Sequence, residues 1–156
     1  MKLLLLSDSH GASDQINRAL QTVKREGIPD ALLYAGDGMT DLIGLDVRIP
    51  MFLVRGNCDM VNPFDAPYEH TLVFSKTTIF LSHGHLQRVK QTLDLLAQKA
   101  KTTGATAAVY GHTHHQQTDY IKGVLFINPG SIRNGKYALL HLRDGENPRA
   151  EPRQLP

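Results

Sequence analysis

Short apolar runs separated by polar turns dominate the sequence, and they predict a protein rich in strands. Lys2–Leu6 is almost continuously apolar and very short, which is typical of a strand buried on both faces. Over Ser13–Glu26 the apolar residues instead recur at spacings of three and four, which predicts an amphipathic helix that Gly27 ends. A second buried strand is predicted at Ala31–Tyr34. This strand–helix–strand order favours an α/β fold with a parallel core.

The second half of the chain contains more predicted strands than helices. One helix is predicted over Arg88–Thr103, where apolar residues line one face and Gly104 follows. Lys122-Gly123 separates two apolar runs and predicts a hairpin, and Ser75-Lys76, between two further predicted strands, suggests a second one. The remaining predicted strands are Met51–Val54, His70–Phe74, Thr77–Leu81, Ala107–Tyr110, Gln117–Ile121, Val124–Ile127 and Tyr137–Leu142. The pattern therefore predicts a mixed β core with few helices.

The length of 156 residues fits one domain, which we expect to span 1–142. The segment 143–156 carries three prolines among charged residues, which predicts an extended C-terminal tail on the surface. The apolar runs are far shorter than the about 20 residues of a membrane span, so we expect no membrane partner. A single Cys excludes an internal disulfide and favours the cytoplasm.

The charge balance narrows the class of partner. The formal net charge is +2, and the chain has no block of Lys or Arg. Tracking of a long nucleic acid depends on many phosphate contacts from such residues, so we expect no long nucleic-acid partner. Histidine is the one over-used residue type, with 8 copies. Because histidine is the commonest metal ligand, the positions of these residues matter most.

Metal-capable residues follow five of the predicted strands, directly after each strand ends. The five clusters are Ser7-Asp8-Ser9-His10, Gly36-Asp37, Arg55-Gly56-Asn57-Cys58-Asp59, Ser82-His83-Gly84-His85 and Gly111-His112-Thr113-His114-His115. In α/β sheets, ligands bind at the carboxyl ends of the strands. We therefore expect these clusters to meet at one edge of the fold.

The clusters supply carboxylate, amide and imidazole donors and no obvious thiolate set. The candidate metal ligands are Asp8, His10, Asp37, Asn57, His83, His112 and His114. These donors suit Mn, Fe, Zn, Co or Ni better than a structural zinc site built on Cys. Seven side chains are too many for one ion and suit two ions that share a carboxylate. Each residue alone has a structural explanation, such as a turn at Asp37, but turns do not need this much histidine.

The same clusters, in this order, resemble the calcineurin-like metallophosphoesterase superfamily. Its pattern is Asp-x-His, Gly-Asp, Gly-Asn-His-Asp/Glu, a later His and then Gly-His-x-His, and here it runs from residue 8 to residue 114. The small size and the Asn128-Pro129-Gly130-Ser131 loop resemble the compact prokaryotic phosphodiesterase branch, which is related to the retromer metallophosphoesterase-like subunit. The resemblance implies a four-layer α/β/β/α sandwich of two mixed β-sheets flanked by helices.

The resemblance also implies roles for the ligand set. One divalent ion would be bound by Asp8, His10 and His114, the other by Asn57, His83 and His112, and Asp37 would bridge the two. Mn is the first candidate, with Zn, Fe, Ni and Co as others. Either His83 or His85 could be the ligand, and His83 is preferred because it lies nearer to the strand. The implied reaction is hydrolysis of a small phosphodiester by in-line attack of a hydroxide that bridges the ions.

The catalytic residues implied in this way are Asn57, Cys58 and His85. Cys58 stands where the family has a His that aids protonation of the leaving group, and a thiol is a poorer proton donor at neutral pH. Water, His85 or His115 are the alternatives. Asn57, His85 and Arg88 are the candidate substrate-binding residues, with Arg133 as a further cation. Asp59 is expected to orient a ligating histidine.

Two other functions remain open at this point. The first is a protein-binding scaffold that keeps the fold without turnover, as the retromer likeness permits. The second is a nuclease for short oligonucleotides. A homo-oligomer is also compatible with the sequence, since symmetric dimers are the commonest assembly. The complete set of candidate ligands favours the enzyme over the scaffold.

Overall fold

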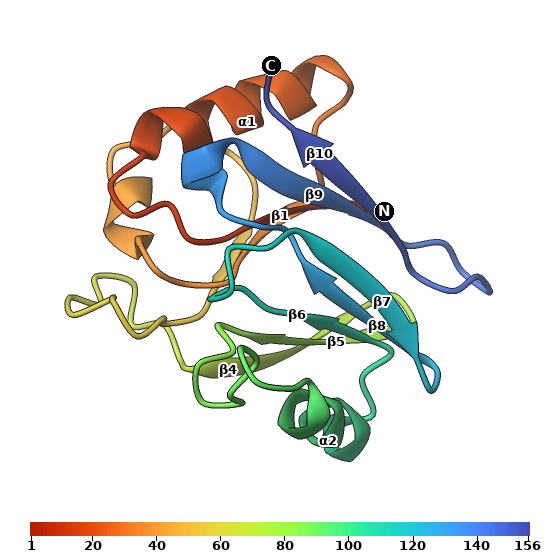
Figure 1. Ribbon diagram of the computed structural model, residues 1–156. Coiled ribbons are helices and arrows are strands. Elements are labelled where there is room, and N and C mark those ends of the chain that lie inside the picture. The colour runs from red at the N-terminus through yellow and green to blue at the C-terminus, as the bar shows by residue number, and fades with distance from the viewer.

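Two five-stranded sheets, packed face to face, form the centre of the molecule (Figure 1). The computed structural model describes residues 1–156. In the first sheet, three strands run parallel to one another: β1 (Lys2–Leu6), β2 (Ala31–Tyr34) and β3 (Met51–Leu53). Two antiparallel strands, β9 (Lys136–His141) and β10 (Arg149–Gln154), complete it on the other side of β1. The strand order is β10-β9-β1-β2-β3.

The second sheet is also mixed, with the order β4-β5-β6-β8-β7. Its central strands β5 (Thr77–Ser82), β6 (Ala107–Val109) and β8 (Val124–Asn128) run parallel. Each edge strand forms an antiparallel hairpin with its neighbour: β4 (Glu69–Phe74) with β5, and β7 (Gln117–Ile121) with β8. Both predicted hairpins, at residues 75–76 and 122–123, are confirmed.

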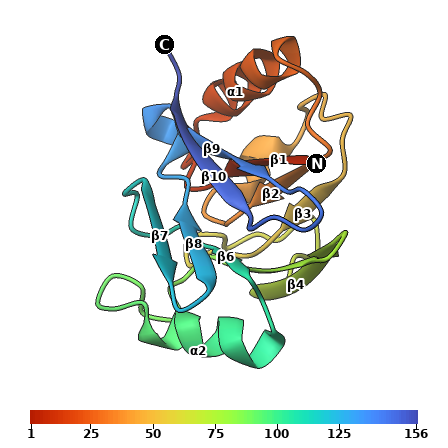
Figure 2. The same ribbon diagram turned by 90° about the vertical axis from the view of Figure 1, so that its right-hand side faces the viewer.

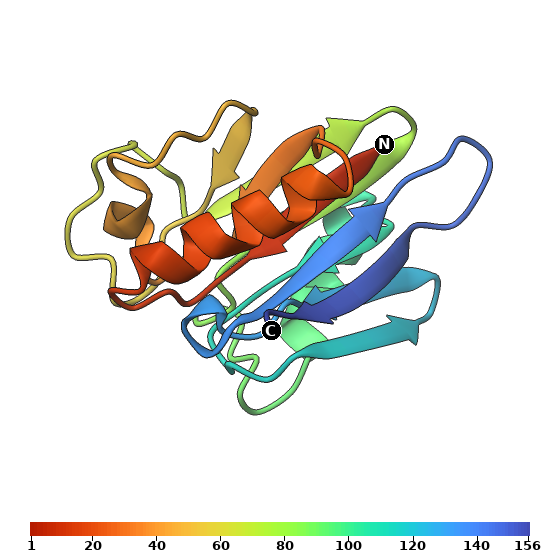
Figure 3. The same cartoon turned by 90° about the horizontal axis from the view of Figure 1, so that it is seen from above.

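One helix covers the outer face of each sheet, so the molecule has four layers (Figures 1 and 2). Helix α1 (Ser13–Arg25) lies across the first sheet, as Figure 3 shows from above, and α2 (Asp94–Thr103) lies against the second. Two short 3-10 helices, η1 (Met39–Leu42) and η2 (Ile132–Asn134), belong to the loops. The four-layer α/β/β/α sandwich is therefore confirmed. Neither helix has the length and apolar character needed to cross a membrane.

The alternation of side chains along β1 shows why its sequence is continuously apolar. Leu4 and Leu6 pack into the core beneath α1, whereas Leu3 and Leu5 pack into the core between the two sheets. All four are fully buried. A strand with both faces covered needs an apolar residue at every position, because neither face meets water. A third core, which includes Phe80 of β5, lies between the second sheet and α2.

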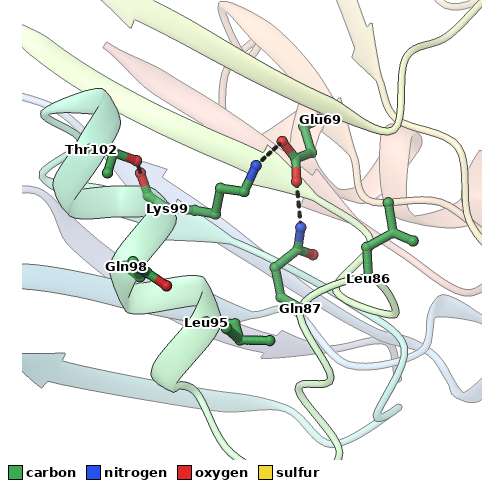
Figure 4. Close-up of a pocket in the computed structure, with 7 residues that line it drawn as sticks. All are labelled: Glu69, Leu86, Gln87, Leu95, Gln98, Lys99 and Thr102. Atoms are coloured by element: carbon green, nitrogen blue, oxygen red, sulfur yellow. Dashed lines mark hydrogen bonds and ion pairs between the residues drawn. The ribbon is translucent and has the colours of Figure 1, made fainter.

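Helix α2 begins at Asp94, so the prediction of a helix from Arg88 is wrong at its start. Arg88 has a φ of 54°, outside the right-handed helical region. Gln87 is drawn inward, where it accepts a hydrogen bond from Ser82 Oγ (2.7 Å) and donates one to Glu69 (2.6 Å; Figure 4). Residues 84–93 form turns and loop instead, and α2 starts at Asp94, whose N–H donates to Thr92 Oγ1.

The C-terminal segment contains a strand that the sequence pattern did not predict. Residues 149–154 form β10 and pair with β9 from Arg149↔His141 to Gln154↔Lys136. Pro152 is tolerated because β10 is the edge strand, where one side of the backbone needs no partner. Beyond the strand, Leu155 is buried in the core beneath α1. The segment is therefore packed against the sheet.

Replacing Leu155 with Ala is expected to lower the free energy of unfolding by about 2–3 kcal/mol, because the change leaves a cavity in the core beneath α1. For a chain of this length, that loss corresponds to a fall of roughly 6 °C in Tm. Thermal unfolding followed by circular dichroism measures it. The matched control is Gln154→Ala at an exposed position. Equal Tm values for the two variants would show that the segment does not stabilise the domain.

Candidate metal centre

The carboxyl ends of parallel strands from both sheets meet at one edge of the sandwich, and all seven candidate ligands lie there. The first sheet contributes the residues after β1, β2 and β3, and the second contributes those after β5 and β6. There are three groups of potential metal donors, and within each group the ligand atoms all lie within 4.8 Å of one another. They are Asp8, His10 and His114; His10, Asp37 and Cys58; and Asp37, His83 and His112.

The first group surrounds a carboxylate oxygen that has no hydrogen-bond partner. Asp8 is fully buried, and its Oδ2 accepts hydrogen bonds from Ser7 Oγ (2.5 Å) and the His112 N–H (3.1 Å). Its Oδ1 accepts none. That oxygen lies 3.2 Å from His114 Nε2 and 3.8 Å from His10 Nε2, and these two nitrogens are 3.2 Å apart. A buried carboxylate oxygen facing two imidazole nitrogens is the arrangement that a bound cation satisfies.

The group of Asp37, His83 and His112 forms, together with Asn57, a second group, which also lacks a hydrogen-bond donor between facing polar atoms. His83 Nδ1 lies 2.6 Å from the Ala35 carbonyl, to which it donates, and this leaves Nε2 to face the centre. Nε2 lies 3.2 Å from Asp37 Oδ2 and 3.1 Å from Asn57 Oδ1. In the neutral imidazole, that nitrogen would point a lone pair at two oxygen atoms. A proton or a metal ion must stand between them, so these residues also fit a divalent ion.

Asp37 connects the two groups. Its Oδ1 accepts the backbone N–H of Cys58 (2.8 Å), which fixes the carboxylate. Its Oδ2 lies 3.2 Å from His83 Nε2 and 3.8 Å from His10 Nε2. Burial alone would raise the pKa of Asp37, but the hydrogen bond and charge of His83 outweigh it and hold the pKa well below its usual range. Asp37 is therefore ionised at neutral pH and lies between both sets of histidines.

The protonation states suit metal binding. Burial, together with the positive charges of His83 and Lys90, lowers the pKa of His112 to about 4, so its imidazole is neutral at pH 7. Burial raises the pKa of Asp8, and nearby imidazoles offset only part of that effect. Burial would lower the pKa of His83, but its contact with Asp37 raises it instead. The metal-free centre thus holds a proton that a cation would displace.

Five of the candidate ligands have a backbone conformation that is uncommon outside glycine. The φ angles are 56° for Asp8, 42° for His10, 61° for Asp37, 68° for His112 and 60° for His114. Asp and His tolerate this left-handed region better than most residues, but it still costs of order 1 kcal/mol at each position. Such strain gathers at functional sites because the surrounding structure maintains it. The turns after β1, β2 and β6 therefore aim the ligands at a cost in stability.

His114 allows this strain to be measured, since it is exposed. In chelator-treated protein, His114→Gly is expected to be more stable than His114→Ala by about 1 kcal/mol, because Gly adopts a positive φ without a steric penalty. Urea unfolding of the two variants gives the difference. The same pair at Asp14 in helix α1 serves as the control, where Gly should be the less stable residue. If the Gly variant were less stable than the Ala variant at both positions, the assignment of strain to His114 would be wrong.

Residues outside the ligand set hold the ligand loops in place. Ser131 Oγ donates to the Asp8 carbonyl (2.7 Å), and Asn128 Nδ2 donates to the Gly111 carbonyl and to Thr113 Oγ1 (2.9 Å each). The Asn128–Ser131 loop therefore ties the turn after β1 to the turn after β6. Gly111 is required for close approach, because a Cβ there would overlap the Ser7 hydroxyl and lie 2.7 Å from Asp8 Oδ2.

Asp59 does not orient a ligating histidine, so that prediction is wrong. Its buried carboxylate instead accepts four backbone N–H groups: Asp37 and Gly56 on Oδ2 (2.8 Å each), and Gly38 (2.8 Å) and Met39 (3.0 Å) on Oδ1. A buried carboxylate is stabilised by such donors without a cation. Asp59 thus joins the loop after β3 to the loop that carries Asp37, and acts on the centre through the backbone.

Cys58 and His85 border the ligand groups. Cys58 is exposed, but partial desolvation of its sulfur together with the charge of Asp37 raises the pKa of its thiol. The His85 ring lies 5.4 Å from that of His83 and 6.2 Å from that of His112, and its buried Nδ1 has no partner. Burial and the charge of His83 lower the pKa of His85. His115 is exposed, and neither it nor His85 belongs to a donor group.

Two cations besides the expected Arg88 lie near the centre, namely Lys90 and Arg55. Arg88 is exposed and lines a separate hollow with residues such as Gln91 and Asp94, none of which belongs to the ligand groups. Lys90 is close enough for its charge to lower the pKa of His112. The Arg55 guanidinium lies 5.4 Å from the centre of the Tyr68 ring, which in turn lies 5.8 Å from the His85 ring. The sequence marked Arg55 only by its position beside Gly56-Asn57.

The four-layer sandwich and the paired His/Asp groups define a metallophosphoesterase-like protein, and the comparisons agree. The sequence matches the model of the calcineurin-like phosphoesterase superfamily domain over residues 1–145. The probable metallophosphoesterase YsnB of Bacillus subtilis is 34% identical over 156 residues, which cover 92% of this chain and 86% of that protein. Phosphodiesterase YfcE of Escherichia coli is 28% identical over 157 residues, with 85% and 79% covered.

A crystal structure of a Vps29 single mutant from Entamoeba histolytica superposes with a TM-score of 0.78 at 19% identity, and covers 100% of both chains. At that identity, the likeness concerns the fold alone. The family match spans most of the sequence, and it includes every candidate ligand. The chain therefore belongs to the calcineurin-like phosphoesterase superfamily, as the resemblance implied, and its curated relatives are metallophosphoesterases and phosphodiesterases.

Proposed function

We propose that this protein is a phosphodiesterase that uses two divalent metal ions to hydrolyse a small phosphodiester by in-line attack of hydroxide on phosphorus. Asp8, His10 and His114 would hold one ion, and Asn57, His83 and His112 the other. One observation supports this above the rest: Asp37 Oδ2 faces His10 from one group and His83 from the other. A carboxylate in that position is suited to bridging two ions.

The residues of the chain perform the steps around the phosphate. When bound, the ions supply Lewis-acid activation of water and of the phosphoryl oxygens. Asn57 lies at the exposed side of the second group, where its amide can both ligate and orient the substrate. Two divalent ions outweigh the carboxylates of Asp8 and Asp37, so the centre attracts a phosphate anion. Lys90, and not only Arg88, adds to this attraction.

Protonation of the leaving group is assigned to the groups that border the centre. Cys58 keeps its proton at neutral pH, because burial and the charge of Asp37 raise the pKa of its thiol. A thiol with a raised pKa is a weak acid, so we propose that substrates with good leaving groups react fastest. His85 is mostly neutral, because its pKa is lowered, so its ring N–H can donate a hydrogen bond to the leaving-group oxygen while Cys58 or water supplies the proton. Manganese activation and a cytoplasmic location remain part of the proposal.

The test is hydrolysis of bis(4-nitrophenyl) phosphate by chelator-treated protein reloaded with Mn²⁺, Zn²⁺, Fe²⁺, Ni²⁺ or Co²⁺ in turn. Release of 4-nitrophenolate measures the rate, and elemental analysis measures bound metal. We expect two equivalents of metal and the highest rate with Mn²⁺. Protein that binds two equivalents but hydrolyses no phosphoester would contradict the proposal and favour a scaffold. Faster cleavage of short single-stranded DNA than of the diester would favour a nuclease.

A further inference from the structure

A hollow of about 320 Å³ adjoins the metal centre on the side of His10 and Cys58. The loop after β3 forms one wall with Met60 and Val61, and the 3-10 helix η1 forms another with Thr40 and Asp41. Its volume is at the low end of the range for ligand pockets, about 300–1,000 Å³. A hollow of this size beside a phosphate-binding centre can take one substituent of a phosphodiester.

The wall formed by Met60 and Val61 is apolar and open. The relative exposures of these residues are 82% and 65%, which is unusual for large apolar side chains next to a charged centre. Neither belongs to any of the three buried cores. Contact with an apolar ligand group would remove this surface from water, at a gain of about 25 cal/mol per Å². The wall therefore suits an apolar or aromatic group.

The charge of the hollow is opposite to that of the metal-loaded centre. The Asp41 carboxylate accepts hydrogen bonds from Ser9 Oγ (2.5 Å) and the Gly11 N–H (2.8 Å), and it forms no ion pair with Lys or Arg. No Lys or Arg lines the hollow. An anionic group placed there would be repelled by Asp41 and would find no cation to bind.

We propose that this hollow binds one ester substituent of the substrate and that it selects an uncharged, apolar or aromatic substituent over an anionic one. The inference rests on the proposed function and narrows its substrate class. The centre binds the phosphate of any diester, whereas the hollow discriminates by the group attached to it. Diesters whose substituents carry further phosphates or carboxylates are poor substrates for this protein.

The selectivity test compares bis(4-nitrophenyl) phosphate with bis(4-carboxyphenyl) phosphate. Both diesters are symmetric, so either substituent can occupy the hollow. Thr40→Lys adds a cation at an exposed lining position and is expected to raise the ratio of kcat/KM values, carboxyphenyl over nitrophenyl, about fivefold. Comparing ratios between variants cancels the different intrinsic reactivities of the two esters.

Gln98→Lys is the matched control, because it adds the same charge on α2, in the groove shown in Figure 4 and outside the hollow. The ratio should stay at the wild-type value in this variant. A ratio that Thr40→Lys leaves unchanged, or that both variants raise equally, would overturn the inference while the proposed function stands. Failure of the metal-loaded wild-type protein to hydrolyse either diester would instead overturn the proposed function and the inference with it.

The apolar wall is tested by Met60→Ala. Because the Met60 side chain is exposed, its truncation removes little packing from the fold. KM for bis(4-nitrophenyl) phosphate is expected to rise about fivefold with kcat nearly unchanged. The reason is that the lost contact stabilises the bound substrate and the transition state equally. Binding is also read directly from methionine-methyl NMR signals of the Zn²⁺-loaded protein titrated with phenylphosphonate. The Met60 signal should shift and the Met51 signal should not. An unshifted Met60 signal together with an unchanged KM would overturn the inference.

Discussion

Replacing Asp37 with Asn is expected to abolish binding of both divalent ions and to lower phosphodiester hydrolysis by at least about a thousandfold. The neutral amide cannot supply the negative charge that Asp37 Oδ2 places 3.2 Å from His83 and 3.8 Å from His10. Because one carboxylate serves both groups, its loss affects two sites at once. Metal content by elemental analysis and the rate with bis(4-nitrophenyl) phosphate measure the two effects.

The control for this substitution is Asp14→Asn, which removes the same charge from an exposed position on helix α1. It should keep two equivalents of metal and the wild-type rate. If the Asp37 variant still bound two equivalents, the bridging assignment would be wrong. If the Asp37 variant lost only one equivalent of metal, Asp37 would be a ligand of one ion alone. The ion that remained would then show which group binds metal without Asp37.

Asp59→Asn is expected to destabilise the protein by about 3–5 kcal/mol, the usual cost of leaving a buried charge network unpaired. Each carboxylate oxygen accepts two backbone N–H groups. In the Asn variant, one of those oxygens becomes an amide NH₂ that faces two other donors. For a chain of this length, we expect Tm to fall by roughly 10 °C. The loops after β2 and β3 should separate, so metal affinity should fall as well.

Asp65→Asn provides the comparison, since Asp65 is exposed in the same stretch of chain and Asn tolerates its positive φ. We expect its Tm to stay within about 1–2 °C of the wild-type value. A small effect of Asp59→Asn on Tm would mean that the four donors find other acceptors. Unchanged metal affinity in a destabilised variant would separate the folding role of Asp59 from its effect on the centre.

The sequence predicts most of this centre because strand ends and ligand positions are both local signals. A buried strand such as Lys2–Leu6 is recognisable from its apolar run, and the residue after it is then placed at the sheet edge by chain geometry alone. The repetition of this arrangement after β1, β2, β3, β5 and β6 makes the joint interpretation stronger than any one motif. All seven candidate ligands are brought together as a result.

The errors arise where a distant residue decides the local structure. Gln87 is drawn inward by Ser82 and Glu69, so the helical periodicity from Arg88 onward does not produce a helix until Asp94. Strand β10 has no apolar alternation, because it gains its partners from β9, at the edge of the sheet. In each case the deciding contact joins segments that the sequence pattern alone cannot pair.

The electrostatic role of Asp59 was also hidden, for a different reason. An acidic residue near histidines is readily interpreted as a partner for an imidazole, whereas its actual partners are backbone N–H groups. Every residue but proline carries such a donor, so no residue type in the sequence marks it. The effect of Lys90 on the pKa of His112 is equally hard to infer, because no motif in the sequence brings these two residues together.

The centre draws its donors from both sheets, and the distance between those sheets is set by the side chains packed between them. Leu5, Leu33 and Ala35 face Leu81 and Val109 in that interior. This layer therefore acts as a spacer for the two halves of the ligand set. A change of volume there, such as Leu to Ala or Ala to Val, would alter the separation of the ligands without touching any of them. Variation in the buried layer is thus a route by which relatives with identical ligands can differ in rate and in metal preference.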